Sequence, residues 1–286
     1  MENESKSLWA HAWDSLKKDK TAVFSMTIIG IYVLLAILTV TGVIASDWSK
    51  EVGASYLPPS LENPFGTDIF GRSVLLKTLK GVEMAIAIGC VTAIISTVIG
   101  VLFGLTAGYF GGKVDEVIVW FYTSQASIPG IMLLFAIMFV LGKGTSTLFI
   151  ALGITSWIPL CRLVRGEVMR HKEREYVQAA AALGAGNRRR MLKHILPNIF
   201  HIVIIQFSLR FQMAIKSEVI LSYLGLGVQG APSWGTMIDD SKLELSRGVW
   251  WQLGAATFAM FFLVLALNLL GDALRDALDP KLKGKA

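Results

Sequence analysis

The chain has little of what a soluble enzyme usually needs. Its 286 residues include 2 cysteines and 4 histidines, and only 17% of them are charged. Cys90 and Cys161 lie in uncharged apolar stretches, which excludes a disulfide framework and a CxxC metal site. The histidines show no HExxH or comparable ligand spacing, and no nucleophile–base pair lies in an apolar run. We therefore expect no catalysis, cofactor or metal site in this chain.

Nucleotide-binding motifs are also missing. The sequence Gly-Leu-Gly-Val-Gln-Gly at 225–230 fits GxGxxG, but it follows an apolar helical run and not a strand. The sequence Gly-Lys-Gly-Thr at 142–145 lacks both the Ser or Thr after Lys and the upstream Gly of a P-loop. Any use of ATP must therefore depend on another subunit.

Long apolar runs dominate what is present. Hydrophobic residues make up 53% of the chain, and about 20 consecutive apolar residues suffice to span a membrane. Uncharged runs cover 21–46, 84–112, 117–142, 144–161 and 248–271, and an apolar run at 195–222 is interrupted by Arg210, Lys216 and Glu218. The run at 21–46 is too long for the apolar part of a signal peptide. We expect an all-α membrane protein with six transmembrane helices.

The positions of Lys and Arg predict the orientation. If both termini are inside, 18 of the 27 basic residues lie in inside segments and 7 in outside segments, and the 162–193 loop alone carries nine. Basic residues accumulate on the cytoplasmic side, so both termini are expected to be cytoplasmic. The net charge of +6 then reflects topology, and nucleic-acid binding is not expected.

Residues 1–20 are expected to form an amphipathic cytoplasmic helix on the inner lipid surface. Leu8, Trp9, Ala12, Trp13 and Leu16 recur at helical spacing, with lysines on the remaining positions. Residues 21–286 then form the transmembrane domain, with outside loops at 47–80 and 223–247. Neither loop is long enough for a separate domain.

The cytoplasmic loop at 162–194 contains a short helix. From Glu175 and Tyr176 the chain continues through Gln178 and an alanine run at 179–182, which are good helix formers. Gly184 and Gly186 follow, and glycine is typical of helix C-termini. A helix at about 175–184 with so little side-chain bulk would let a partner approach its backbone closely. Connected to the next span through Leu196-Pro197, it could act as a lever.

The Ala-Ala, Gly and Leu-Pro spacing resembles the "EAA" coupling loop of ABC importer permeases, with Gln178 where the first acid usually stands. The resemblance covers nearly the whole chain and is to the C-type permeases of dipeptide, oligopeptide and nickel ABC importers. Its other motifs are Asn-Pro-Phe-Gly-Thr-Asp at 63–68 with Gly71-Arg72, Tyr-Phe-Gly-Gly at 109–112 with Asp115, residues 162–167 with 174–176, Glu218 with 221–227 and 232–235, and Asn-Leu-Leu-Gly-Asp at 268–272 with 275–276 and 278–280.

The resemblance implies a type I ABC importer permease fold in a bacterial or archaeal inner membrane, with peptides as the expected substrate. It also implies four kinds of partner: a second (B-type) permease, two ATP-binding cassette subunits that bind ATP and Mg, an extracytoplasmic substrate-binding protein and membrane lipid. The ATPase-coupling residues would be Glu175, Tyr176, Gln178, Ala179, Ala180, Leu183 and Gly184. Disrupting Gly184 or charging Ala180 should uncouple ATP hydrolysis from transport.

The charges within 195–222 suggest a pathway. A charge at mid-membrane costs roughly 2.5–3.5 kcal/mol, so such residues usually face water or a counter-charge. Arg210 and Ser217 share a helical face, with Lys216 and Glu218 beside it. One hypothesis is that these four residues line the translocation pathway. The alternative is an internal salt bridge or snorkelling to a membrane surface.

Two further alternatives remain open from the sequence. Gly100, Gly104 and Gly108 form a ridge that allows close helix approach, either within this chain or against the partner permease. The rival function is an ATP-independent secondary transporter or channel subunit. That class predicts inverted repeats and paired mid-membrane acids, and we find no internal repeat.

Overall fold

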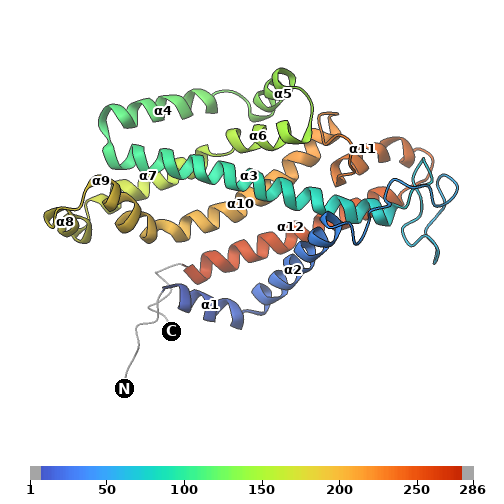
Figure 1. Ribbon diagram of the computed structural model, residues 1–286, viewed down its shortest axis with the longest axis horizontal. Helices are drawn as coiled ribbons and strands as arrows, with labels where there is room; N and C mark the ends of the chain where they lie inside the picture. The colour runs from blue at the N-terminus through green and yellow to red at the C-terminus, as the bar shows by residue number, and fades with distance from the viewer. Residues whose placement is uncertain (1–7, 279–286) are drawn as a thin grey trace. The chain divides into compact units, whose positions relative to one another are not determined.

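The computed structural model describes residues 8–278 and the side chains from Ala12 onward, and this part of the chain is helical apart from its loops and two isolated β-bridges. The start of the expected N-terminal helix, the Trp9 side chain and the motif residues 279–280 lie outside it. The helices are α1 Leu8–Lys18, α2 Lys20–Val40, α3 Val74–Phe110, α4 Gly112–Ala126, α5 Gly130–Leu141, α6 Thr145–Thr155, α7 Ile158–Lys172, α8 Glu175–Ala182, α9 Asn187–Arg189, the π-helix η1 Arg190–Ile195, α10 Leu196–Tyr223, α11 Trp234–Leu245 and α12 Trp251–Leu278 (Figure 1).

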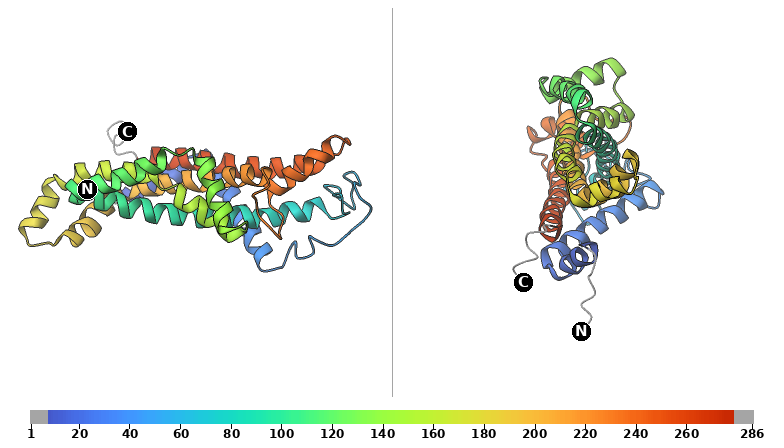
Figure 2. Two further views of the ribbon diagram at one scale, coloured as in Figure 1. Left: turned by 90° about the horizontal axis from the view of Figure 1, so that it is seen from above. Right: turned by 90° about the vertical axis from the view of Figure 1, so that its left-hand side faces the viewer.

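The chain divides into two compact units, and the first comprises residues 1–90, 143–148 and 212–286. Within it α2 lies along α12, and α11 and α1 also pack on α12 (Figures 1 and 2). Leu16 of α1 is buried with Ala22 and Ala273. The apolar side of α1 therefore meets helices of its own chain, while Trp13 is exposed beside Lys17.

The second unit comprises residues 91–142 and 149–211. It contains the second part of α3, helices α4, α5, α7, α8 and α9, most of α6, the π-helix η1 and the first part of α10. Its apolar core is formed by α3, α7, α8, η1 and α10 and includes Leu105, Val168 and Ile195. The short helix α8 is thus part of this unit's core and not a detached loop segment.

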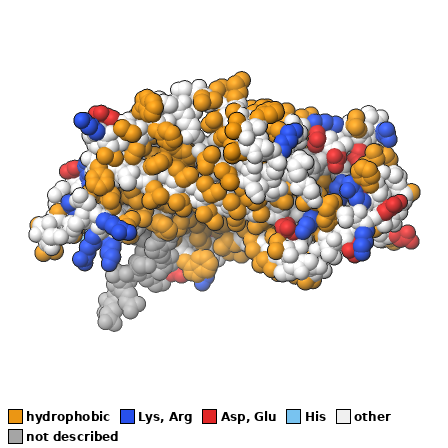
Figure 3. Space-filling view, turned by 45° about the horizontal axis from the view of Figure 1, so that its top comes forward, with side chains coloured by type: hydrophobic (Ala, Val, Ile, Leu, Met, Phe, Trp, Pro, Cys, Tyr) orange, Lys and Arg blue, Asp and Glu red, His pale blue; other side chains and the backbone are white. Residues whose placement is uncertain are grey.

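Within residues 8–278, five helical segments are long and apolar enough to cross a membrane: Lys20–Val40, Val74–Phe110, Thr145–Lys172, Asn187–Tyr223 and Trp251–Leu278. Helices α4 and α5 would make a sixth span if counted together, but they meet at an angle of 89° at Pro129. Proline lacks an N–H and disfavours helix in the preceding residue, which explains the break. On the face shown in Figure 3, hydrophobic side chains predominate and charged ones form separate groups.

Two helices extend beyond the expected spans. Helix α3 begins at Val74, ten residues before the uncharged run, because the Lys77 and Lys80 side chains are paired with carboxylates. Helix α7 continues to Lys172, so the expected loop at 162–194 is largely helical. Its apolar positions Val164 and Val168 are four apart and both buried, which sustains an amphipathic helix despite the basic residues.

Candidate functional site

Helix α8 confirms the short helix predicted before Gly184. Glu175 lies in its first turn, where a negative charge favours the helix dipole. At its end the Ala185 N–H donates to the Ala180 carbonyl (2.9 Å), and Gly184 has φ of +83°. This is the Schellman arrangement, which requires a left-handed residue. Nothing lies within 4 Å of a Cβ built at Gly184, so backbone conformation and not space selects glycine there.

The two faces of α8 differ sharply. Val177 and Ala180 are buried, whereas Tyr176 and Ala179 are exposed and Leu183 is 88% exposed. The structure therefore corrects one part of the coupling hypothesis. Ala180 faces the interior of its own chain, so a charge at Ala180 would disrupt packing and would not report on a partner. The surface open to a partner consists of Glu175, Tyr176, Gln178, Ala179, Leu183 and Gly184.

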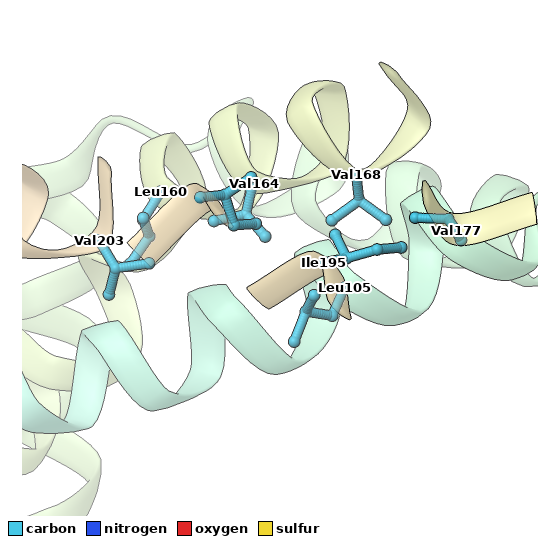
Figure 4. Packing of buried hydrophobic residues seen from close by; sticks show 8 residues of the cluster. Leu105, Leu160, Val164, Val168, Val177, Ile195 and Val203 are labelled. Atoms are coloured by element: carbon cyan, nitrogen blue, oxygen red, sulfur yellow. The ribbon is translucent and has the colours of Figure 1, made fainter. Parts of the chain in front are cut away.

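Val177 joins α8 to four other elements (Figure 4). Its side chain lies in one apolar cluster with Leu105 of α3, Val168 of α7, Ile195 of η1 and Val203 of α10. Interiors of this kind are close-packed and transmit displacement between neighbours. A push on α8 is therefore passed to the helices around it through this apolar contact, and two exposed hydrogen bonds, Tyr176 Oη to His171 Nδ1 (2.7 Å) and the Gln178 amide to the Lys172 carbonyl (3.2 Å), also join α8 to the end of α7.

The connection from α8 to α10 includes the π-helical turn η1. Such turns are rare and concentrate at functional sites. Just before it, Asn187 Oδ1 accepts hydrogen bonds from Tyr109 Oη (3.1 Å) and from Arg190 Nη2 (2.5 Å), and Arg190 lies over the Tyr109 ring. This polar cluster attaches the start of the π-helical turn to the end of α3.

The glycine ridge of α3 packs closely on α7 of the same chain and not against a partner permease. A Cβ at Gly104 would lie 2.7 Å from Val164, and one at Gly108 would lie 2.6 Å from the Arg165 carbonyl. These glycines therefore serve packing within the chain. At the same contact, the Arg165 guanidinium binds both carboxylate oxygens of Asp115, each at 2.5 Å, which joins α7 to the first turn of α4.

The interruption between α6 and α7 explains the position of Arg210. Carbonyl groups left free at membrane depth cost several kcal/mol each. Here the Gln125 amide donates to the Ile154 and Thr155 carbonyls (3.2 and 3.4 Å), and Arg210 Nη1 donates to the Ser156 carbonyl (3.1 Å). A cation is also favoured at the negative end of the α6 dipole. The sequence offered no counter-charge for Arg210. In the structure its partner is the Ser156 carbonyl.

The other charges of α10 behave differently. Glu218 is only 3% exposed and accepts hydrogen bonds from the Ser222 and Ser233 hydroxyls, each at 2.6 Å. It holds the segment after α10 and does not line an open surface, contrary to the pathway hypothesis. Lys216 is exposed and Ser217 is half-buried, so these two remain accessible.

A buried charged cluster in the first unit was missed by the sequence reasoning. Lys77 is 2% exposed, and its ammonium group binds Asp68 Oδ2 (2.8 Å) and Gln252 Oε1 (2.7 Å). Asp68 also accepts from the Arg72 side chain (2.8 Å). The Gln252 amide donates to Glu244 Oε2 (3.2 Å). The motif at residues 63–72 contains Asp68 and Arg72 and so pointed to these two members of the cluster. Nothing in that motif indicated that Lys77 or Gln252 would join them.

Burial has opposite outcomes for the pKa values of Asp68 and Glu244 in this cluster. Burial alone would raise the pKa of Asp68, but the charge and hydrogen bond of Lys77, together with hydrogen bonds from Arg72, hold that pKa below its usual value. Burial raises the pKa of Glu244 to about 7, because the neighbouring Lys77 compensates only in part. Within residues 8–278, no group of three His, Cys, Asp or Glu side chains could hold a metal ion.

Comparison with known proteins agrees with this geometry. Residues 100–284 match the family described as the binding-protein-dependent transport system inner membrane component, and residues 7–59 match the N-terminal TM domain of oligopeptide transport permease C. The dipeptide transport system permease protein DppC of Bacillus subtilis is 37% identical over 95% of this chain and 85% of its own.

Two further relatives and one solved structure extend the comparison. The oligopeptide permease OppC of the same bacterium is 37% identical over 98% of this chain and 92% of its own. The glutathione permease GsiD of Pectobacterium atrosepticum is 35% identical over 79% of this chain and 75% of its own. An inward-facing structure of the MetNI methionine ABC transporter aligns with a TM-score of 0.55 at 17% identity, covering 72% of this chain and 96% of that one. At that identity the likeness shows the fold alone, the type I importer permease fold.

Proposed function

Because the chain belongs to the inner-membrane components of binding-protein-dependent transport systems, and among them to the C-type permeases of peptide ABC importers, we propose that it forms half of the pathway of an ATP-driven peptide importer. Relatives named for dipeptide, oligopeptide and glutathione transport support peptides as the substrate class. The family membership decides against a self-contained secondary transporter or channel.

The proposed complex contains a second, B-type permease, two ATPase subunits that bind ATP and Mg, and an extracytoplasmic binding protein. In this complex α8 and both chain termini lie on the cytoplasmic side, where α8 faces the ATPases. The loop at residues 41–73 lies on the opposite side and faces the binding protein. The distribution of Lys and Arg supports this orientation. Of the expected pathway face Glu218 is buried, and Arg210 is half-buried and hydrogen-bonded to the Ser156 carbonyl; we assign the pathway to the exposed Lys216 and the half-buried Ser217.

The observation that carries the proposal is that α8 exposes Ala179 and the apolar Leu183 outward while Val177 anchors the helix in the core shared by α3, α7, η1 and α10. Leu183, 88% exposed beside the small Ala179, presents an apolar side chain that a pocket on a partner would bury. Closure of the ATPases would press on this face, and the close-packed core would move α7 and α10 with it. This is a bistable element that is biased by binding.

Leu183→Asp tests the contact. The side chain is exposed, so the subunit should fold and insert normally, while a charge in a desolvated contact weakens binding roughly tenfold or more. The measurements are ATPase retention when the tagged permease is purified, and peptide uptake by vesicles. Both should fall by that factor.

Leu243→Asp is the matched control, because Leu243 is also highly exposed (75%) but lies on α11. It should leave ATPase retention unchanged. Normal ATPase retention and normal uptake by Leu183→Asp would overturn the proposed coupling face.

A further inference from the structure

A groove of about 470 Å³ runs along α12 in the first unit, apart from the proposed coupling face. Its lining on α12 recurs every three to four residues from Trp250 to Phe262, and its opposite wall comes from Pro59, Pro64 and Phe65 of the loop. Twelve residues of helix rise about 18 Å. The groove therefore starts at the end of a membrane-spanning helix and descends into the hydrocarbon region.

Its cross-section alternates a small floor with large walls. Gly254, Ala255 and Ala259 form the floor, while Trp250 and Phe258 stand beside it, 61% and 63% exposed. A Cβ at Gly254 would meet only the Trp250 ring, at 3.5 Å, so the floor is open. Because the floor is open and narrow between aromatic rings, it suits a single flexible methylene chain.

The groove is rigidly framed on two sides. The Trp251 indole N–H donates to the Thr67 carbonyl (2.9 Å), which ties the loop wall to α12. Tyr32 of α2 donates its hydroxyl to the Ala259 carbonyl (2.7 Å), which holds α2 against α12 near the floor. The shape therefore exists before any occupant arrives.

The mouth of the groove is interfacial and carries a positive charge. Tryptophan is enriched at membrane–water interfaces, and Trp250 and Trp251 lie there at the start of α12. Arg247 is exposed three residues earlier, and its guanidinium lies over the Tyr56 ring at 5.7 Å. Among the described residues no carboxylate forms a salt bridge with Arg247, so its charge is available to a ligand phosphate.

We propose that the groove binds one phospholipid, with an acyl chain between Trp250 and Phe262 and its phosphate against Arg247. A helix of the same length would occupy about 1,400 Å³, three times the groove, and would touch only the rim. The apolar floor alone gains little in a bilayer, since lipid tails are equally apolar. Shape and the arginine–phosphate contact therefore supply the selectivity. The proposed orientation places this lipid in the outer leaflet, but the site itself does not depend on the proposed function.

Native mass spectrometry of the purified transporter, titrated with palmitoyl-oleoyl-phosphatidylglycerol, tests the site. The matching diacylglycerol serves as the probe without phosphate. Gly254→Leu should fill the floor and lower retention of both probes at least tenfold. Arg247→Gln should lower retention of the phospholipid about fivefold, the effect of one interfacial cation, and leave the diacylglycerol unchanged.

Gly30→Leu is the matched control, since Gly30 of α2 also has open space around it and is exposed. It should retain both probes as the unmodified protein does. If Gly254→Leu does not assemble, Trp250→Ala removes an exposed wall and should also lower retention. Unchanged phospholipid retention in the assembled floor or wall variant would overturn the proposal, as would a cysteine at 255 that cross-links to a partner subunit in the groove. Because retention is measured without transport, this result is independent of Leu183→Asp.

Discussion

Helix α8 and the loop at residues 41–73 are attached to the protein by opposite means. The buried attachment of α8 is the apolar packing of Val177 and Ala180, and its hydrogen bonds from Tyr176 and Gln178 to the end of α7 lie at the exposed surface. The loop is held by Asp68, which is completely buried and paired with Lys77 and Arg72. Apolar contacts have no preferred direction, whereas a buried ion pair holds only in one geometry.

The difference shows how one chain provides both a movable part and a fixed part. A close-packed apolar cluster passes a displacement of α8 to its neighbours without separating any buried charges, and the π-helical turn η1 lies directly in the chain's path to α10. The loop cannot shift without separating buried charges, which costs several kcal/mol. We therefore expect variants of the loop cluster to affect stability and variants of α8 to affect coupling.

Lys77→Met should have the largest effect. It removes the ammonium group and leaves Asp68 as a buried charge with only Arg72 beside it, which we expect to destabilise the subunit by about 3–5 kcal/mol. The measurement is thermal unfolding of the purified transporter, together with its yield. Lys80→Met removes a partly exposed pair with Glu83 and should cost less than about 1 kcal/mol. Equal stability of the two variants would contradict a structural role for the buried cluster.

Glu244→Gln should have a smaller effect that depends on pH. The pKa of Glu244 is raised from 4.5 to about 7, so the folded protein holds a proton that the unfolded chain releases. Stability therefore falls as pH rises from about 4.5 to 7 and is constant above that.

Glutamine mimics the protonated side chain and removes this loss. The variant should match the unmodified protein near pH 4.5 and exceed it at pH 8 by at most about 3 kcal/mol. Unfolding temperatures measured across this range test the prediction, with Glu62→Gln on the exposed loop as the control. A parallel pH profile for the unmodified protein and Glu244→Gln would show that Glu244 does not titrate in this window.

Gly184→Ala should have the smallest effect on stability. Alanine at φ of +83° costs about 1 kcal/mol and loosens the end of α8. Gly186 has φ of −65°, which any residue adopts, so Gly186→Ala is the control. Peptide taken up per ATP hydrolysed, measured in reconstituted vesicles, should fall for Gly184→Ala only. An unchanged ratio of peptide taken up to ATP hydrolysed would show that coupling does not depend on the left-handed turn at Gly184.

The apolar runs and the glycine positions predicted the helices well, because hydropathy and helix termination are local properties. Helix α8, its end at Gly184 and the family followed from such patterns. The sequence did not show which side of α8 is inward, and hence placed Ala180 at the partner surface. Periodicity over eight residues cannot decide this when most of them are alanine. Likewise Lys77 and Gln252 are 175 residues apart, so their contact was not predictable from spacing.

The interruption between α6 and α7 has a consequence for how the protein is made. The Ser156 carbonyl receives its hydrogen bond from Arg210, which is synthesised 54 residues later. Chains are made and begin to fold from the N-terminus, so the carbonyl of this interruption exists before its donor does. The hydrogen bond that completes the earlier span can form only once α10 has been made and packed beside it.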